Sequence, residues 1–404
     1  MTPTAPERRR RPSRSRAGFT LVELLVVLVI LSLLIALLLP AIAGAIRKAR
    51  GAAVQAEINQ LAQALAAFKS QFGDYPPSRV ILNESGGLPS GSTLPVPSGG
   101  NPTGTVADIT IGQLADRTAT AMRKFWPRAQ FSTSGPRFSP GSTEWYDFNG
   151  TGSQEAVDFV LQGHECLVFF LGGIPLNVSG PISVIGFGKS PTNPFSNGVQ
   201  GSSMYSGNRT PPMFEFKSER LQLTLLTSLP TGSGYSAFLS ATSRNPGYID
   251  SLDGQGNKQS FYAYFSTNVG NGYDPNDVNL GIDSDGNGGT PLTLAFFSGQ
   301  PTFSSGGRTQ FVESPSPNPY ATGVTYLPPP PAFAVPYQNP QTFQIISPGT
   351  DGMYGIGGAY MPTATTALPY PTLPAGGSAT TSSDAGVRNL ESDNLTNFHN
   401  GTLQ

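Results

Sequence analysis

The sequence has little cysteine and little charge, and both shortages narrow what the chain can be. Its one cysteine among 404 residues, Cys166, excludes a disulfide within the chain and a metal cluster built on several cysteines. Charged side chains make up 12% of the residues, about half of the usual share, whereas glycine (48 residues) and proline (38 residues) are unusually frequent. We expect a loop-rich body that contains β-strands, lies outside the cytoplasm, and is held together by packing, backbone pairing or a bound ion.

The sequence also lacks the common motifs of catalysis. No GxSxG, HExxH or phosphate-binding GxxxxGK[ST] pattern occurs in it. His164 lies close to Cys166, but Cys166 begins an apolar run, 166–171, which is typical of a protein core. We therefore interpret Cys166 as a packed core residue rather than a nucleophile. The sequence predicts a protein that is not an enzyme and requires no cofactor.

Positive charge gathers at the N-terminus and is scarce elsewhere. Residues 1–18 carry six arginines and one acid, Glu7. Taking these from the totals of 24 basic and 25 acidic side chains leaves 18 basic and 24 acidic ones in the rest of the chain. A mildly acidic remainder has no basic surface for nucleic acid, so we predict no nucleic-acid partner.

A long apolar segment follows the arginines and contains a carboxylate near its start. The segment 19–46 is longer than the roughly 20 residues that a helix needs to cross a bilayer core. The arginines before it predict that the N-terminus stays in the cytoplasm and that everything after Ile46 is exported. Glu23 is then out of place, because a carboxylate at membrane depth costs about 2.5–3.5 kcal/mol and needs a cationic partner. A secretory signal peptide has a shorter apolar region with its cleavage site after it, and a simple anchor gives Glu23 no role.

The residues around Glu23 resemble a known processing motif. Residues 16–23, RAGFTLVE, are similar to the prepilin cleavage and methylation motif of type IV pilins and type II secretion pseudopilins, and Pro40 also fits that family. The resemblance implies that prepilin peptidase cleaves between Gly18 and Phe19 and methylates the new amino group of Phe19. It also implies that Glu23 pairs with this amino group on a neighbouring subunit, which would remove much of the cost of burying the carboxylate.

The resemblance implies a structural subunit of a type IV pilus-like or type II secretion pseudopilus filament. Its partners would be prepilin peptidase, homologous pilin or pseudopilin subunits, the inner membrane, and the filament assembly platform with its ATPase. The chain would cross the bacterial inner membrane once, with its body in the periplasm or, in the filament, outside the cell. The alternative is a membrane-tethered ligand-binding or adhesive domain outside the cytoplasm that uses a pilin-like anchor.

The helix is predicted to continue beyond the membrane segment. Apolar residues recur at helical spacing along one stripe: Val54, Ile58, Leu61, Leu65, Phe68 and Phe72. Gly73 suits a helix C-cap, and Pro76 and Pro77 cannot continue a helix. We therefore expect one helix over 19–72, kinked or locally melted at Pro40. The chain divides into a leader (1–18), a membrane and polymerisation helix (19–46), an amphipathic stem (47–77) and a body (78–404) that ends in a polar tail.

The body is predicted to be an α+β fold, with the long helix packed on a small antiparallel sheet that carries long loop-rich insertions. We expect a surface loop over 83–105 and a helix over 112–125. The apolar segment 163–175 could be a strand or a short buried helix, which periodicity alone does not decide. The predicted strands are 214–216, 259–267, 293–297 and 342–347.

Two regions are candidates for calcium binding. Asp283, Asp285 and Asn287 have the spacing that opens a calcium loop, although the twelfth position is Leu294 rather than glutamate, so a polar turn is the alternative. Residues 346–358, followed by 392–398, resemble the calcium-binding region of major pseudopilins. That resemblance makes Asp351 and Asp393 candidate ligands, with a spacing that departs from the family because of the insert between them.

Overall fold

The structure of the chain is a computed structural model, and it describes residues 20–91, 111–155, 158–176, 181–196, 208–223, 245–252, 260–267, 272–273, 304–305, 308–309, 318–322, 337–352, 354, 357–363, 368 and 390–403. The chain divides into two compact units, Met1–Ala49 and Arg50–Gln404. Helix α1, Leu21–Phe72, contributes residues to both units.

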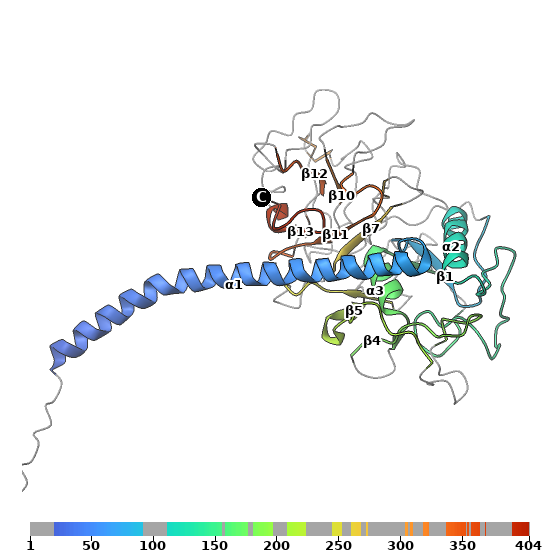
Figure 1. The fold of residues 1–404 in the computed structure, drawn as a ribbon, viewed down its shortest axis with the longest axis horizontal. Coiled ribbons are helices and arrows are strands. Elements are labelled where there is room, and N and C mark those ends of the chain that lie inside the picture. The colour runs from blue at the N-terminus through green and yellow to red at the C-terminus, as the bar shows by residue number, and fades with distance from the viewer. Residues whose placement is uncertain are drawn as a thin grey trace, which may run out of the picture. The chain divides into compact units, whose positions relative to one another are not determined.

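Helix α1 confirms the long helix that the sequence predicts (Figure 1). It ends where expected, because Gly73 adopts a φ of +85° and its N–H donates to the carbonyl of Lys69 at 2.8 Å. The helix continues through Pro40 without a break, so of the two expectations, a kink or local melting, the local melting is wrong. A proline removes its own N–H from the hydrogen-bond ladder, and the many other bonds of a 52-residue helix keep the helical path.

The C-terminal part of α1 forms one side of the core of the second unit. Its buried residues are Val54, Ile58, Leu61, Ala64, Leu65 and Phe68. These are the predicted stripe with Ala64 added, whereas Phe72 is half-buried. The Phe68 ring meets Phe125 and Phe170 edge to face, with ring centroids 5.1 and 5.8 Å apart. Such edge-to-face aromatic pairs add to the burial of apolar area, so this end of α1 belongs to the core of the body.

The strands form several small sheets, which confirms the α+β class. β11 (Phe343–Ser347) lies between β7 (Ala263–Ser266) and β13 (Leu395–Thr396), antiparallel to both (Figure 1). β1 (Val80–Asn83) pairs with β2 (Asp158–Leu161), also antiparallel. The remaining antiparallel pairs are β3 (Pro175–Leu176) with β4 (Ser183–Val184), β5 (Leu221–Leu223) with β6 (Pro246–Tyr248), and β8 (Ser304–Ser305) with β9 (Arg308–Thr309). β10 (Asn318–Ala321) and β12 (Gly357–Ala359) are parallel.

Two helices pack on these strands. α2, Ile111–Phe125, confirms the predicted helix and packs against β1. α3, Gly163–Gly172, settles the ambiguous segment as a helix, and every one of its residues is buried. Glu165 helps to start α3, because its carboxylate accepts the N–H of Gln162 at 2.9 Å. Short 3-10 turns, η1 (Ser218–Arg220) and η4 (Leu390–Asp393), precede β5 and β13.

Three predictions about the body need correction or lie outside the described residues. Residues 214–216 are not a strand, because Phe214 and Phe216 lie in an irregular segment where both rings pack against Tyr248. The predicted surface loop 83–105 is wrong at its start, because Glu84 is fully buried against the body, and residues 92–105 lie outside the described residues. The predicted strand 293–297 lies outside the described residues. Strand β11 confirms the prediction for 342–347, and β7 is shorter than predicted.

Candidate functional site at the start of helix α1

The first turn of α1 holds Glu23 in a capping box. The Glu23 carboxylate accepts the N–H and the hydroxyl of Thr20, at 2.8 and 2.9 Å. In return, the N–H of Glu23 donates to the Thr20 hydroxyl at 3.3 Å. This reciprocal arrangement satisfies donors that a helix start otherwise leaves free. The Thr-x-x-Glu spacing of residues 20–23 is the sequence signal that could have predicted this box. Glu23 thus has a local structural role as well as the predicted role between subunits.

The apolar side chains that follow are exposed on all sides of the helix. Among the residues that the structure describes, every exposed large apolar side chain lies between Leu21 and Ile46. Leu21 is 79% exposed and Leu39 65%. Ser32 keeps its hydroxyl satisfied within the helix by donating to the carbonyl of Val29 at 2.8 Å. In length and composition α1 can cross a membrane, and its apolar surface requires a covering.

The predicted cleavage site lies outside the part of the chain that the structure describes, which begins at Thr20. Gly18 and Phe19 are therefore known from the sequence alone. Pro40 lies inside α1 in the exposed apolar segment. Glu23 thus lies four residues after the expected new N-terminus in the sequence, and the structure places Pro40 within the membrane-length helix.

Comparison with known protein families decides what this segment is. Residues 13–39 match the prokaryotic N-terminal methylation motif. The match contains Gly18, Phe19 and Glu23 and confirms the motif predicted from residues 16–23. Together with the long apolar helix, it fits the type IV pilin and pseudopilin family, whose members are processed by prepilin peptidase and assemble with other pilin subunits. No curated protein and no solved structure matches the chain.

The predicted calcium ligands near the C-terminus lie close together despite the insert between them. The Asp393 carboxylate accepts the backbone N–H groups of Thr350 and Asp351, at 2.7 and 3.2 Å, and also the Thr350 hydroxyl. Its other oxygen is buried and has no hydrogen-bond partner. Within the described ranges, no three acidic, histidine or cysteine side chains converge as metal ligands. Asp283, Asp285 and Asn287 lie outside those ranges.

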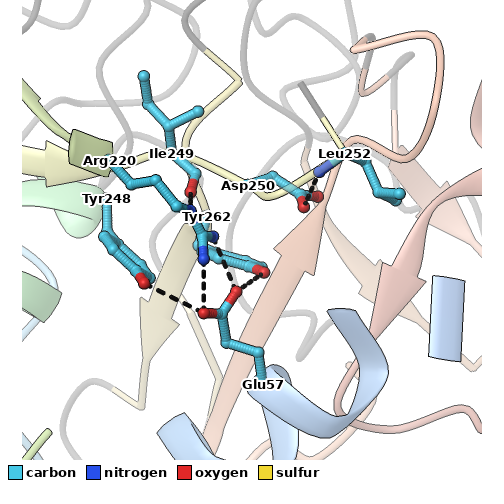
Figure 2. Close-up of polar contacts among 7 residues, drawn as sticks. All are labelled: Glu57, Arg220, Tyr248, Ile249, Asp250, Leu252 and Tyr262. Carbon is cyan, nitrogen blue, oxygen red and sulfur yellow. Dashed lines mark hydrogen bonds and ion pairs between the residues drawn. The ribbon is translucent and has the colours of Figure 1, made fainter. Parts of the chain in front are cut away.

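A second polar cluster fastens α1 to the body. Figure 2 shows the Glu57 carboxylate pointing from α1 toward Arg220, Tyr248 and Tyr262. Both Glu57 oxygens accept the Arg220 guanidinium, at 2.6 and 2.8 Å, and each also accepts a tyrosine hydroxyl, from Tyr248 at 3.1 Å and Tyr262 at 2.6 Å. Arg220 also donates to the carbonyl of Ile249 at 2.7 Å. The cluster joins the stem to the segments around β5, β6 and β7.

The electrostatics of this cluster favour the charged pair. Burial alone would raise the pKa of Glu57, but hydrogen bonds from Arg220 and Tyr262 outweigh it and hold that pKa below its ordinary value. The Arg220 guanidinium also lies over the Tyr248 ring, 4.2 Å from its centre. Next to the cluster, burial raises the pKa of Asp250 to about 6. Local sequence patterns do not indicate this cluster, because Glu57 and Arg220 are far apart along the chain.

The residues considered for catalysis lie in the core. Cys166 is fully buried, as predicted. His164 is also buried beside the ring of Phe261, and burial lowers its pKa to about 3, so the imidazole is neutral. Elsewhere, a cavity of about 470 Å³ lies beside α2, with Asp74, Arg79 and Lys124 among its lining residues. None of these features assembles a nucleophile with a base in the described part of the chain.

Proposed function

We propose that the chain is a structural subunit of a pilus-like or pseudopilus filament that is assembled through the N-terminal half of α1. The observation that supports this best is Glu23 in the first turn of a membrane-length helix that carries the methylation motif. After cleavage, Phe19 becomes the N-terminus, and Glu23 pairs with the ammonium group of Phe19 on the next subunit. That ion pair neutralises both charges in an apolar bundle and sets the stagger between subunits.

This role assigns a function to each remaining part of the chain. The leader 1–18 is removed, residues 19–46 lie first in the inner membrane and then in the filament core, and the stem 47–77 carries the body 78–404 outside the cytoplasm. The leader arginines keep the N-terminus cytoplasmic, where an assembly platform and its ATPase act. The subunit has no enzymatic role. Asp351 and Asp393 are the proposed calcium ligands of the pseudopilin type, and Asp283, Asp285 and Asn287 are the alternative set.

Intact mass spectrometry of the membrane-derived protein tests processing. We expect a mature chain that begins with methylated Phe19. A chain that retains Met1 would contradict the proposal. It would favour the alternative, a tethered ligand-binding or adhesive domain for which the cavity beside α2 is the candidate binding site.

Substitutions at the first turn separate the two roles of Glu23. Glu23→Gln keeps an acceptor for Thr20 and removes the charge, whereas Thr20→Ala removes the cap hydroxyl and keeps the charge. If the carboxylate pairs with an ammonium group of another subunit, Glu23→Gln abolishes filaments and Thr20→Ala leaves them intact. The reverse result would assign Glu23 to helix capping. Both variants should still be processed and inserted, which is checked by mass and by membrane fractionation.

A further inference from the structure

A polar loop in the body has the residue spacing of a calcium loop. Taking Asp147 as the first position, Asn149 is the third, Thr151 the fifth and Glu155 the ninth, which are ligand positions in the twelve-residue EF-hand loop. The sixth position, which is glycine in that loop, is Gly152, and it adopts a φ of +74°. This region is distinct in sequence from the two calcium candidates named above.

The loop is already folded around its first residue. The two carboxylate oxygens of Asp147 accept the N–H groups of Thr151 and Gly152, at 3.0 and 2.9 Å. The Asn149 side-chain oxygen accepts the N–H of Thr151 at 3.1 Å, and its amide donates to Glu155 at 3.3 Å. Asp147 and Asn149 are both fully buried. Asp147 and Asn149 are thus held in the interior, whereas Thr151 and Glu155 are partly exposed.

An independent observation comes from Glu84, which directly follows strand β1. Glu84 is 0% exposed, and one of its carboxylate oxygens accepts the backbone N–H of Glu155 at 2.6 Å, so the carboxylate points into the loop. Its other oxygen is buried and has no hydrogen-bond partner. A buried carboxyl oxygen without a donor is costly, because it loses its hydration and gains no hydrogen bond in return. This oxygen is available to a cation.

The surroundings of Glu84 are short of positive charge. Burial is the main cause that raises its pKa, to about 9, and the negative charges of Asp147 and Glu155 act in the same direction. Burial likewise raises the pKa of Asp147, to about 6. A divalent cation bound here would offset the cost of ionising both carboxyl groups.

We propose that Glu84 and the loop 147–155 bind a calcium ion. Asp147, Asn149, Glu155 and Glu84 supply side-chain oxygens, and the loop backbone supplies carbonyl oxygens, which suits the six to eight oxygen ligands of calcium. Asp158 holds the twelfth position, but its carboxylate accepts the Asn83 amide at 2.7 Å in the β1–β2 pair. Glu84 replaces it as the acidic ligand from outside the loop. Because no three acids converge in the described residues, binding also requires a side-chain rotation.

The site would tie two distant segments of the body together. Glu84 continues β1, and the loop leads into β2, which pairs with β1. A cation between them would close the end of this two-stranded sheet. In a chain with one cysteine, such a clamp would provide a cross-link that no disulfide within the chain can. This inference does not depend on the filament role.

The test uses the full chain in detergent micelles, stripped of metal with a chelator and then titrated with calcium chloride or magnesium chloride. We expect calcium to raise the unfolding temperature and magnesium to do so far less, because magnesium prefers a rigid octahedral site and keeps its waters. Terbium, which replaces calcium, should show emission sensitised by Tyr146, the residue before Asp147. The absence of any calcium response at millimolar concentration would overturn the inference.

Variants assign the response to this loop. Glu84→Gln and Asp147→Asn keep the size of the side chains and should lower calcium affinity at least tenfold. Glu84→Gln should leave the metal-free protein as stable as before, so it remains informative if Asp147→Asn does not fold. The matched control is Asp393→Asn in the C-terminal region, which should not change the terbium signal of Tyr146. A response that survives both loop variants and disappears in Asp393→Asn would overturn the inference.

Discussion

At the scale of single residues, Asp250 is a buried acid whose charge the fold disfavours. It is 2% exposed, and its carboxylate accepts the N–H of Leu252 at 2.9 Å and the hydroxyl of Ser347. Burial is the main cause that raises the pKa of Asp250, to about 6, and the negative charge of Glu57 raises it further. Hydrogen bonds from Ser347 and Leu252 and the positive charge of Arg220 act in the opposite direction. The folded protein therefore holds a proton on Asp250 at a pH where the unfolded chain has lost it.

This residue makes stability depend on pH. Because the folded pKa lies above the unfolded value of about 3.9, the contribution of Asp250 to stability falls as the pH rises from about 4 to about 6. Asp250→Asn cannot titrate. The unfolding free energy of the variant minus that of the parent protein should therefore rise by about 2–3 kcal/mol between pH 4 and pH 7. Denaturant unfolding at the two pH values measures the gain, and a difference that does not change with pH would contradict it.

At the scale of one element, the stem of α1 depends on a buried ion pair as well as on its apolar stripe. The side chains of Arg220 and Glu57 are only 12% and 14% exposed. Removing one partner of such a pair leaves the other charge buried and typically costs about 3–5 kcal/mol. We expect Glu57→Ala to lower the stability of the body by about this amount, measured by denaturant unfolding of the detergent-solubilised chain.

The chain offers a matched control for this prediction. Lys124 and Asp74 form an ion pair with an N–O distance of 2.8 Å, but their side chains are 46% and 51% exposed. Exposed pairs contribute little, so Lys124→Ala should change stability by less than about 1 kcal/mol. Equal effects of Glu57→Ala and Lys124→Ala would show that burial of the Glu57 pair is not what gives it its strength.

At the scale of the whole molecule, features set by local pattern could be predicted and features set by distant contacts could not. Helix α1, its buried stripe and α2 follow from apolar periodicity and from helix-ending residues such as Gly73. The motif around Glu23 was recognised because it lies in consecutive residues. In contrast, the sequence does not reveal that Glu57 meets Arg220, because that pairing depends on the path of the chain between them.

The same distinction explains the errors. Phe214 and Phe216 have the composition of a strand, yet packing on Tyr248 rather than backbone pairing places them. Residues after Asn83 read as a polar surface loop, but Glu84 is drawn inward by the backbone of Glu155, a partner that local composition does not indicate. Local composition therefore does not predict which polar residues are buried, when the burial depends on a specific distant partner.

The division of the chain into two compact units leads to a last prediction. The second unit begins at Arg50 and includes the stripe residues of α1, from Val54 to Phe68, in its core. A protein consisting of residues 50–404 should therefore fold without detergent, because it keeps this core and lacks the exposed apolar segment. A protein consisting of residues 73–404 loses the stripe and Glu57 and should not fold. Circular dichroism and cooperative thermal unfolding of the two proteins check this. Cooperative unfolding of residues 73–404 would show that the stem is an attachment to the body rather than part of its core.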